Sequence, residues 1–128
     1  MLQTLAVQTV PAVKVNPFAN VFHLTHVVKI IIPSTVNVNQ SIDTSAYVDE
    51  VAALLSDLNG GATITDGNGC WLSPVEGLVK EPVKIVSSAC EELTEKLLVK
   101  LYEYAVKVKV ELSQEAVAVE IDGALYFI

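Results

Sequence analysis

The residues with the clearest chemical potential lie in one glycine-rich stretch, residues 60–77, which reads GGATITDGNGCWLSPVEG. It holds five of the six glycines, the only tryptophan and one of the two cysteines. Gly67 and Gly69 resemble half of a phosphate-binding loop, but Cys-Trp-Leu follows them where such a loop needs a helix. The pattern therefore favours a turn or bulge at residues 66–69, in which glycines supply positive φ.

This turn has consequences for Trp71. The turn would place the indole ring against apolar surface, either in the core or at a subunit contact. We then expect valine at position 67 or 69 to strain the backbone, and Trp71→Ala to cost about 3–5 kcal/mol of stability. The alternative is that the stretch holds a ligand. In that case the binding residues would be Thr65, Asp66, Gly67, Gly69, Trp71 and Glu81.

Catalytic and metal-binding patterns are weak. His23 and His26 are three residues apart, which places them on opposite faces of a strand. Cys70, Cys90 and His26 lack the paired-cysteine spacing of a zinc site. We assign no catalytic residue, metal or cofactor. Were the protein an enzyme, its candidate groups would be His26, Asp66 and Glu81.

Charge and composition limit the classes of partner. The net charge is −7, and all eight basic residues are lysines. A chain without a basic patch is a poor nucleic-acid binder. Without arginine it also lacks the planar guanidinium group that binds phosphates through paired hydrogen bonds. Hydrophobic residues make up 52% of the chain, yet none of its apolar runs approaches the ~20 residues of a membrane helix. Such excess apolar surface predicts a homo-oligomer, a dimer or trimer.

The expected location is the cytoplasm. The first basic residue is Lys14, so no charged segment precedes the N-terminal apolar stretch as it would in a secretory signal. Two cysteines are too few for a disulfide framework.

Hydrophobic periodicity predicts the elements that would position these residues. Residues 1–25 form an extended arm, and a strand covers 26–32. Residues 42–61 contain a helix that ends at Asn59-Gly60. Strands follow at 62–65 and 78–88. The sequence S-A-C-E at 88–91 fits a capping box that begins a second helix, although VKVKVEL, residues 106–112, also suits a strand. Residues 115–128 read as strand, with Asp122-Gly123 a hairpin turn.

This order is β-α-β-β-α-β with an N-terminal arm. It predicts an α+β domain over residues 26–128, the ferredoxin-like arrangement with an antiparallel sheet and two helices on one face. Strand alternation assigns one set of residues to one face, namely Val28, Ile30, Val83, Ile85, Val117, Val119 and Ile121. The other face receives Val27, Lys29, Ile31, Lys84, Val86, Ala118 and Glu120. The second face is mixed in polarity, which suits a wet pocket or a subunit interface.

Two resemblances extend this interpretation. Gly60-Gly61, Thr63, Gly67-x-Gly69-x-Trp71, Glu81 and Gln114-Glu115-x-Val117 resemble a pattern in small bacterial and phage proteins of unknown function, over residues 26–128. A weaker resemblance, through Gly61, Thr63, Ile64, Thr65, Gly67 and Gly69, is to PII-like signalling proteins, which are trimers that bind nucleotides between subunits. The glycine-lysine nucleotide loop of PII proteins has no counterpart after the second helix.

These observations lead to one main hypothesis and two alternatives. The main hypothesis is a non-enzymatic, oligomeric, ferredoxin-like protein that binds a small molecule or regulates in a PII-like way. The first alternative is a small enzyme of the dimeric ferredoxin-like kind. The second is a structural or interaction module.

Overall fold

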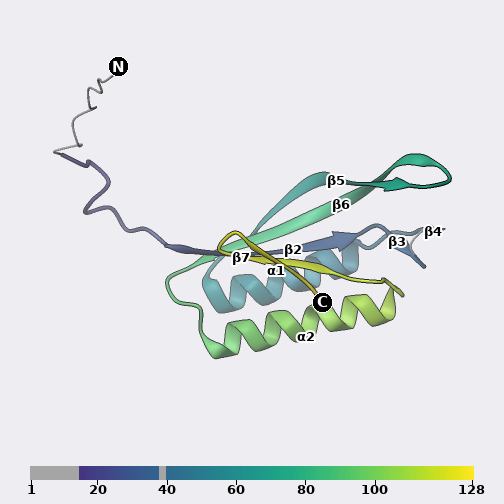
Figure 1. Ribbon diagram of the computed structural model, residues 1–128. Helices are drawn as coiled ribbons and strands as arrows, with labels where there is room; N and C mark the ends of the chain where they lie inside the picture. The colour runs from purple at the N-terminus through teal and green to yellow at the C-terminus, as the bar shows by residue number, and fades with distance from the viewer. Residues whose placement is uncertain (1–14, 38–39) are drawn as a thin grey trace, which may run out of the picture.

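In the computed structural model, which describes residues 15–37 and 40–128, the chain is an α+β protein. Its main strands are β2 (His26–Pro33), β5 (Thr63–Ser73), β6 (Gly77–Cys90), β7 (Ala118–Ile121) and β8 (Ala124–Phe127). They form one antiparallel sheet in the order β5-β6-β2-β7-β8. The helices α1 (Ser45–Asn59) and α2 (Glu95–Glu111) cover one face of it (Figure 1). This arrangement is compatible with the ferredoxin-like fold that the sequence predicts.

A small two-stranded sheet follows the central strand. It consists of β3 (Thr35–Val36) and β4 (Gln40–Ser41). Residues 15–25, the described part of the predicted arm, are exposed and contain no strand, whereas residues 1–14 lie outside the described part of the chain. No helix in residues 15–37 and 40–128 is both long and apolar enough to cross a bilayer.

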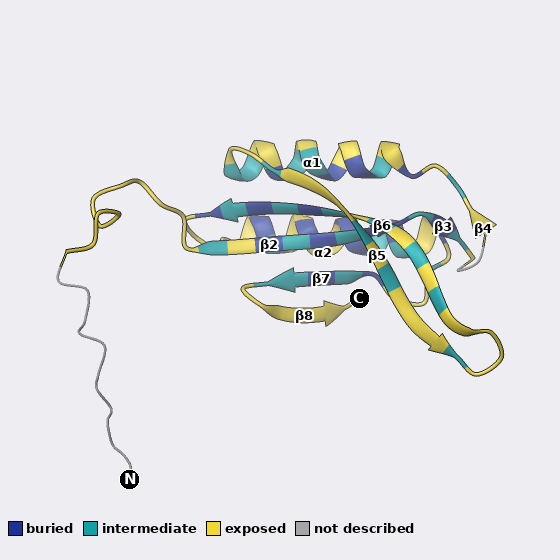
Figure 2. Ribbon diagram, turned by 90° about the horizontal axis from the view of Figure 1, so that it is seen from above, coloured by how far each residue is buried: buried dark blue, intermediate teal, exposed yellow. Residues whose placement is uncertain are grey.

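The core lies between the sheet and the two helices. Alternate residues of β2, namely Val28, Ile30 and Ile32, are fully buried against them, and the dark bands along β2 in Figure 2 mark this face. Helix α1 contributes Val48, Val51 and Leu55, and α2 contributes Leu97, Leu101, Tyr104, Ala105 and Val108. The three- and four-residue spacing of these side chains gives each helix one apolar stripe.

The predicted faces of β6 are wrong by one residue. Ile30 of β2 lies opposite Val86, and Ile31 lies opposite Ile85. Because directly opposed residues share a face, Val86 belongs to the core, while Val83 and Ile85 lie on the open face with Ile31. The strand segment VKIVSSAC buries Val86, Ser88 and Cys90. Its core face therefore includes a serine, which a search for alternating hydrophobic residues does not detect.

The start of the second helix is also corrected. Ser88 and Glu91 form no capping box, because β6 continues to Cys90. Thr94 is the N-cap instead, and its hydroxyl accepts a hydrogen bond from the Leu97 amide at 3.1 Å. The Ser88 hydroxyl instead donates a hydrogen bond to the Gly61 carbonyl, just before β5. The ambiguous segment at residues 106–112 is helical to Glu111.

The other predicted ends are confirmed. Helix α1 stops at Gly60, which is left-handed with φ 95°. Asp122 and Gly123, with φ of 49° and 87°, connect β7 to β8 as a two-residue hairpin turn.

The predicted turn at Asp66–Gly69 does not form. These residues lie inside β5 and pair with residues 81–84 of β6. The chain reverses at residues 74–76 instead, where Gly77 takes φ +78°. The glycine-rich stretch is therefore one arm of a long hairpin whose exposed tip extends beyond the helices (Figure 2). Continuous pairing with β6 outweighs the turn preference of Asp-Gly and Asn-Gly.

Candidate functional site

The six residues predicted to bind a ligand lie on the β5–β6 hairpin, but they are divided between its two faces. Asp66 lies on the side of the helices, in register with Lys84. Alternation places Thr65, Gly67, Gly69 and Trp71 on the open face. Glu81 lies opposite Gly69 and shares that face. The hairpin thus faces two different hollows.

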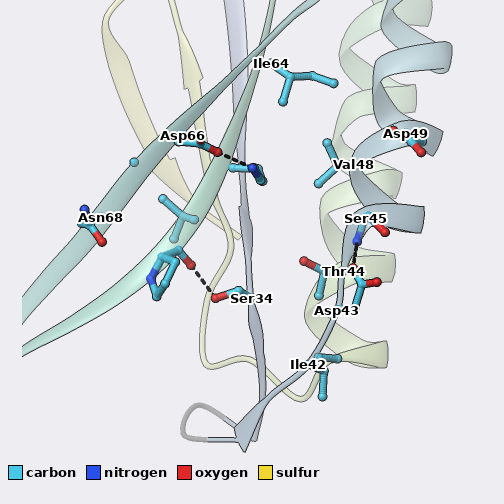
Figure 3. A pocket seen from close by; sticks show the side chains of 14 residues that line it. Ser34, Ile42, Asp43, Thr44, Ser45, Val48, Asp49, Ile64, Asp66 and Asn68 are labelled. Carbon is cyan, nitrogen blue, oxygen red and sulfur yellow. Dashed lines mark hydrogen bonds and ion pairs between the residues drawn. The ribbon is translucent and has the colours of Figure 1, made fainter.

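The first pocket, the larger of the two, lies between the hairpin and the N-terminus of α1, and has a volume of about 560 Å³. Figure 3 shows Ile64, Asp66 and Asn68 on the strand side, and on the helix side it shows Asp43, Thr44, Ser45, Val48 and Asp49. Its apolar wall is built from Ile42, Val48, Ile64 and Pro82. A volume of a few hundred cubic ångströms with apolar walls is typical of small-molecule sites.

Charged groups sit at the rim of this pocket. Asp66 forms an ion pair with Lys84, and both side chains are at least half exposed. Asp43 accepts a hydrogen bond from the Ser45 amide at 2.9 Å, and this bond lowers the pKa of the Asp43 carboxyl. Asp49 also lines the pocket. With three carboxylates and one ammonium group, the rim is negative at neutral pH.

The position of the helix N-terminus follows from local contacts. Thr44, the N-cap, makes no side-chain capping bond, because its buried hydroxyl donates to the Pro33 carbonyl at 2.8 Å. That contact ties the start of α1 to the end of β2. Ser34, the next residue, donates from its hydroxyl to the Pro82 carbonyl at 2.6 Å and so joins β2 to the hairpin. These two bonds fix both walls of the first pocket.

The second pocket, of about 460 Å³, contains Trp71 and Glu81. Its remaining lining residues are Ser34, Thr35, Ser41, Ser73, Glu76, Val79, Lys80 and Pro82. The Trp71 side chain is 50% exposed, so it is not a core residue of this chain, contrary to one of the two placements that the sequence favours. Its predicted placement at a subunit contact stays a prediction.

The three candidate catalytic groups are not brought together. Asp66 lines the first pocket and Glu81 the second. His26 lies at the start of β2, where its Nδ1 is 2.6 Å from Asp122 Oδ2. Within residues 15–37 and 40–128, His, Cys, Asp and Glu side chains form no group of three that could hold a metal.

Sequence reasoning missed the contribution of α1. It predicts the helix within residues 42–61, but it had no reason to connect Asp43, Thr44, Ser45 or Asp49 with β5. The link depends on the packing of α1 against the hairpin, which no spacing in the sequence reveals. Ser34 was missed for the same reason.

Comparisons with known proteins found no matching family model and no matching curated protein. The predicted membership in a family of small phage and bacterial proteins therefore stays a prediction. Two solved structures are similar. One is a phage SAM lyase in complex with S-methyl-5'-thioadenosine, 20% identical, with a TM-score of 0.60 over 84% of this chain and 94% of that one. The other is a phage SAM lyase in the apo state, 19% identical, with a TM-score of 0.59 over 80% and 87%.

At this identity the likeness is one of fold. The neighbours nevertheless contradict the main hypothesis of a non-enzymatic, PII-like regulator, because both are structures of an enzyme. They favour the first alternative that the sequence left open, a small enzyme. One of them also holds a small-molecule ligand, consistent with the expectation of a small-molecule partner.

Proposed function

We propose that this protein is a small enzyme that binds S-adenosylmethionine and cleaves it to release S-methyl-5'-thioadenosine. The observation that carries the proposal is the shared fold with a phage SAM lyase that holds this nucleoside. The first pocket, between β5 and α1, is the proposed binding site.

The lining of the first pocket suits a nucleoside without phosphates. Ile42, Val48 and Ile64 supply apolar surface for an adenine ring and a methylthio group. The carboxylates of Asp49 and Asp66 can accept hydrogen bonds from ribose hydroxyls, as acidic residues do in other nucleoside sites. A chain without arginine is poorly equipped for phosphates, and this ligand has none.

The charge of the pocket suits the substrate. S-adenosylmethionine carries a sulfonium cation, and the rim offers Asp43, Asp49 and Asp66 against the single ammonium group of Lys84. The net charge of −7 also attracts a cation at long range. The same groups bind the neutral product less strongly, which favours its release.

The reaction is balanced within the substrate. The electron pair of the bond between the sulfonium sulfur and the γ-carbon stays on sulfur, which becomes the neutral thioether of the product. The substrate's own carboxylate closes onto the γ-carbon and forms a lactone, so neither water nor an external base is consumed. The protein's part is to hold the methionine chain bent toward its γ-carbon and to keep water away.

Product analysis tests the proposal. We expect wild-type protein to convert S-adenosylmethionine to S-methyl-5'-thioadenosine, detected by liquid chromatography with mass spectrometry. Ile64→Trp, which fills the pocket, and Asp66→Asn should each reduce the rate at least tenfold. Asp57→Asn, on the exposed side of α1, is the matched control and should keep the wild-type rate. Failure to form product, together with failure of the nucleoside to bind in calorimetry, would refute the proposal.

Three finer statements accompany this function. We infer that the fold is the ferredoxin-like one, supported by the antiparallel order β5-β6-β2-β7 and by the helices on one face. We infer a homo-oligomer, supported by apolar residues on the open face of the sheet. We also infer a cytoplasmic location, supported by the scarcity of cysteine.

A further inference from the structure

The second pocket contains the only tryptophan of the chain beside a carboxylate. Trp71 lies opposite Val79, and Glu81 is two residues further along β6. Residues in this diagonal relation share a face and lie within reach of an aromatic ring. With half of its surface exposed, the indole offers a ring face within the pocket.

The Glu81 carboxylate is held in place by a hydrogen bond from Thr35, which is itself fixed by Gln114. Its Oε2 accepts a hydrogen bond from the Thr35 hydroxyl at 2.5 Å, and Thr35 is only 8% exposed. The Gln114 amide in turn donates to the Thr35 carbonyl at 2.9 Å and to the Leu112 carbonyl at 3.1 Å. Gln114 thereby connects β3 to the end of α2. A carboxylate fixed in this way does not have to be ordered when a ligand binds.

The hydroxyl groups of the pocket are mostly occupied already. Ser34 donates to the Pro82 carbonyl, and Thr35 donates to Glu81. Ser73 accepts from the amides of Val75 and Glu76 at 3.2 and 3.1 Å. Three of the four hydroxyls that line the pocket are therefore engaged within the protein. A ligand that relies on hydroxyl donors would find few free ones here.

The balance of charge favours a cation. Glu76, Glu81 and Lys80 all line the pocket, so their formal charges sum to one net negative charge at neutral pH. A tryptophan face attracts cations through its quadrupole, by about 0.5–2 kcal/mol according to exposure. A methylated cation meets both conditions, because it carries charge without hydrogen-bond donors.

We propose that the second pocket binds a methylated organic cation, a quaternary ammonium or methylsulfonium group, against Trp71 and Glu81. The site is separate from the first pocket and does not depend on the proposed function. Its failure would leave the cleavage reaction at the first pocket untouched, since the two are tested by different ligands and variants.

The single tryptophan provides the test. Trp71 fluorescence is titrated with choline, with S-methylmethionine, with the neutral choline isostere 3,3-dimethylbutan-1-ol, and with methylamine. We expect saturable changes with choline or S-methylmethionine, and at least tenfold weaker binding of the neutral isostere and of methylamine. The tighter of the two cations identifies the ammonium or the sulfonium as the preferred ligand.

Variants then assign the site. Glu81→Gln keeps an acceptor for Thr35 and removes the charge, and it should weaken choline binding at least fivefold. Lys80→Met should strengthen binding. Glu103→Gln, an exposed position on α2, is the matched control and should change nothing. Circular dichroism checks that each variant is folded.

Three outcomes would overturn the proposal. One is binding of the neutral isostere as tight as that of choline. Another is an unchanged affinity in folded Glu81→Gln. The third is tighter binding of methylamine than of the methylated cations, which would mean that hydrogen bonds dominate the pocket.

Discussion

At the scale of single residues, Gly67 and Gly69 of β5 both lie in the extended strand, but they differ in the room they leave for a side chain. A Cβ at position 69 would meet Val83 Cγ1 at 3.7 Å and the Glu81 carbonyl at 3.8 Å, which are ordinary contacts. At position 67 it would lie 3.2 Å from Ile85 Cδ1 and 3.3 Å from Val83 Cγ2, which is crowded. Neither glycine has a positive φ, so the predicted backbone strain is absent.

This geometry predicts an order of stabilities for three valine variants. Gly69→Val should raise the free energy of unfolding by about 0.5–1 kcal/mol, because glycine weakens a strand. Gly67→Val should have a lower free energy of unfolding than Gly69→Val, because the Ile85 and Val83 side chains must shift to admit the added side chain. Gly77→Val, at φ +78°, should destabilise by about 1–3 kcal/mol. Urea denaturation measures all three, and a loss at position 69 as large as at 77 would contradict the strand assignment.

At the scale of elements, one side-chain contact joins β2 to the β7–β8 turn. Asp122 accepts from the Val27 amide at 2.8 Å and contacts His26 Nδ1 at 2.6 Å. Both bonds lower the pKa of Asp122, and the bond with His26 has the larger effect. The stability from this ionised carboxyl is therefore present above its unfolded pKa of about 4 and is lost as pH falls through the lower folded value.

Asp122→Asn tests this contact. Asparagine tolerates the left-handed backbone at this position (φ 49°), so the turn is kept, while the charge is removed and one of the two acceptor oxygens becomes an NH2 group. We expect the variant to melt at a lower temperature than wild type at pH 7, and the difference to shrink below pH 4. Asp57→Asn serves as the control. A difference that does not change with pH would show that the charge of Asp122 contributes nothing.

At the scale of the whole molecule, the face of the sheet away from the helices carries apolar side chains. Ile31 and Ile85 lie opposite one another there, and Leu125 and Phe127 of the edge strand β8 are 50% and 70% exposed. Lys29 and Glu120 form a 3.8 Å ion pair on the same face. The mixed polarity that the sequence predicts is therefore present, although β6 contributes Val83 and Ile85 instead of Lys84 and Val86.

Sedimentation tests the inferred oligomer. We expect the wild-type protein to sediment as an oligomer at micromolar concentration, because burial of this apolar surface favours association. Phe127→Glu should shift it toward the monomer, and Tyr102→Glu, at an exposed aromatic on α2, should not. A wild-type monomer at this concentration would rule out the oligomer.

The sequence by itself determined most of the elements. The apolar stripes of α1 and α2, the β-branched run of β2, and the Gly60 and Asp122-Gly123 signals were all read correctly, because these features depend on neighbours within a few residues. It also predicts, from charge and arginine content alone, that a phosphate-dependent site is disfavoured.

Only the tertiary structure decided the rest. Asp66–Gly69 is strand and not turn because β6 pairs with it along its whole length, and the faces of β6 follow from the register of Ile30 with Val86. The same pairing separates Asp66 from Trp71 and Glu81, and the packing of α1 supplies the opposite wall of the first pocket. Local propensity favours a conformation weakly, whereas a ladder of hydrogen bonds and a buried face fix it cooperatively. For this reason the sequence could name residues of both pockets but could not assign them to two separate sites.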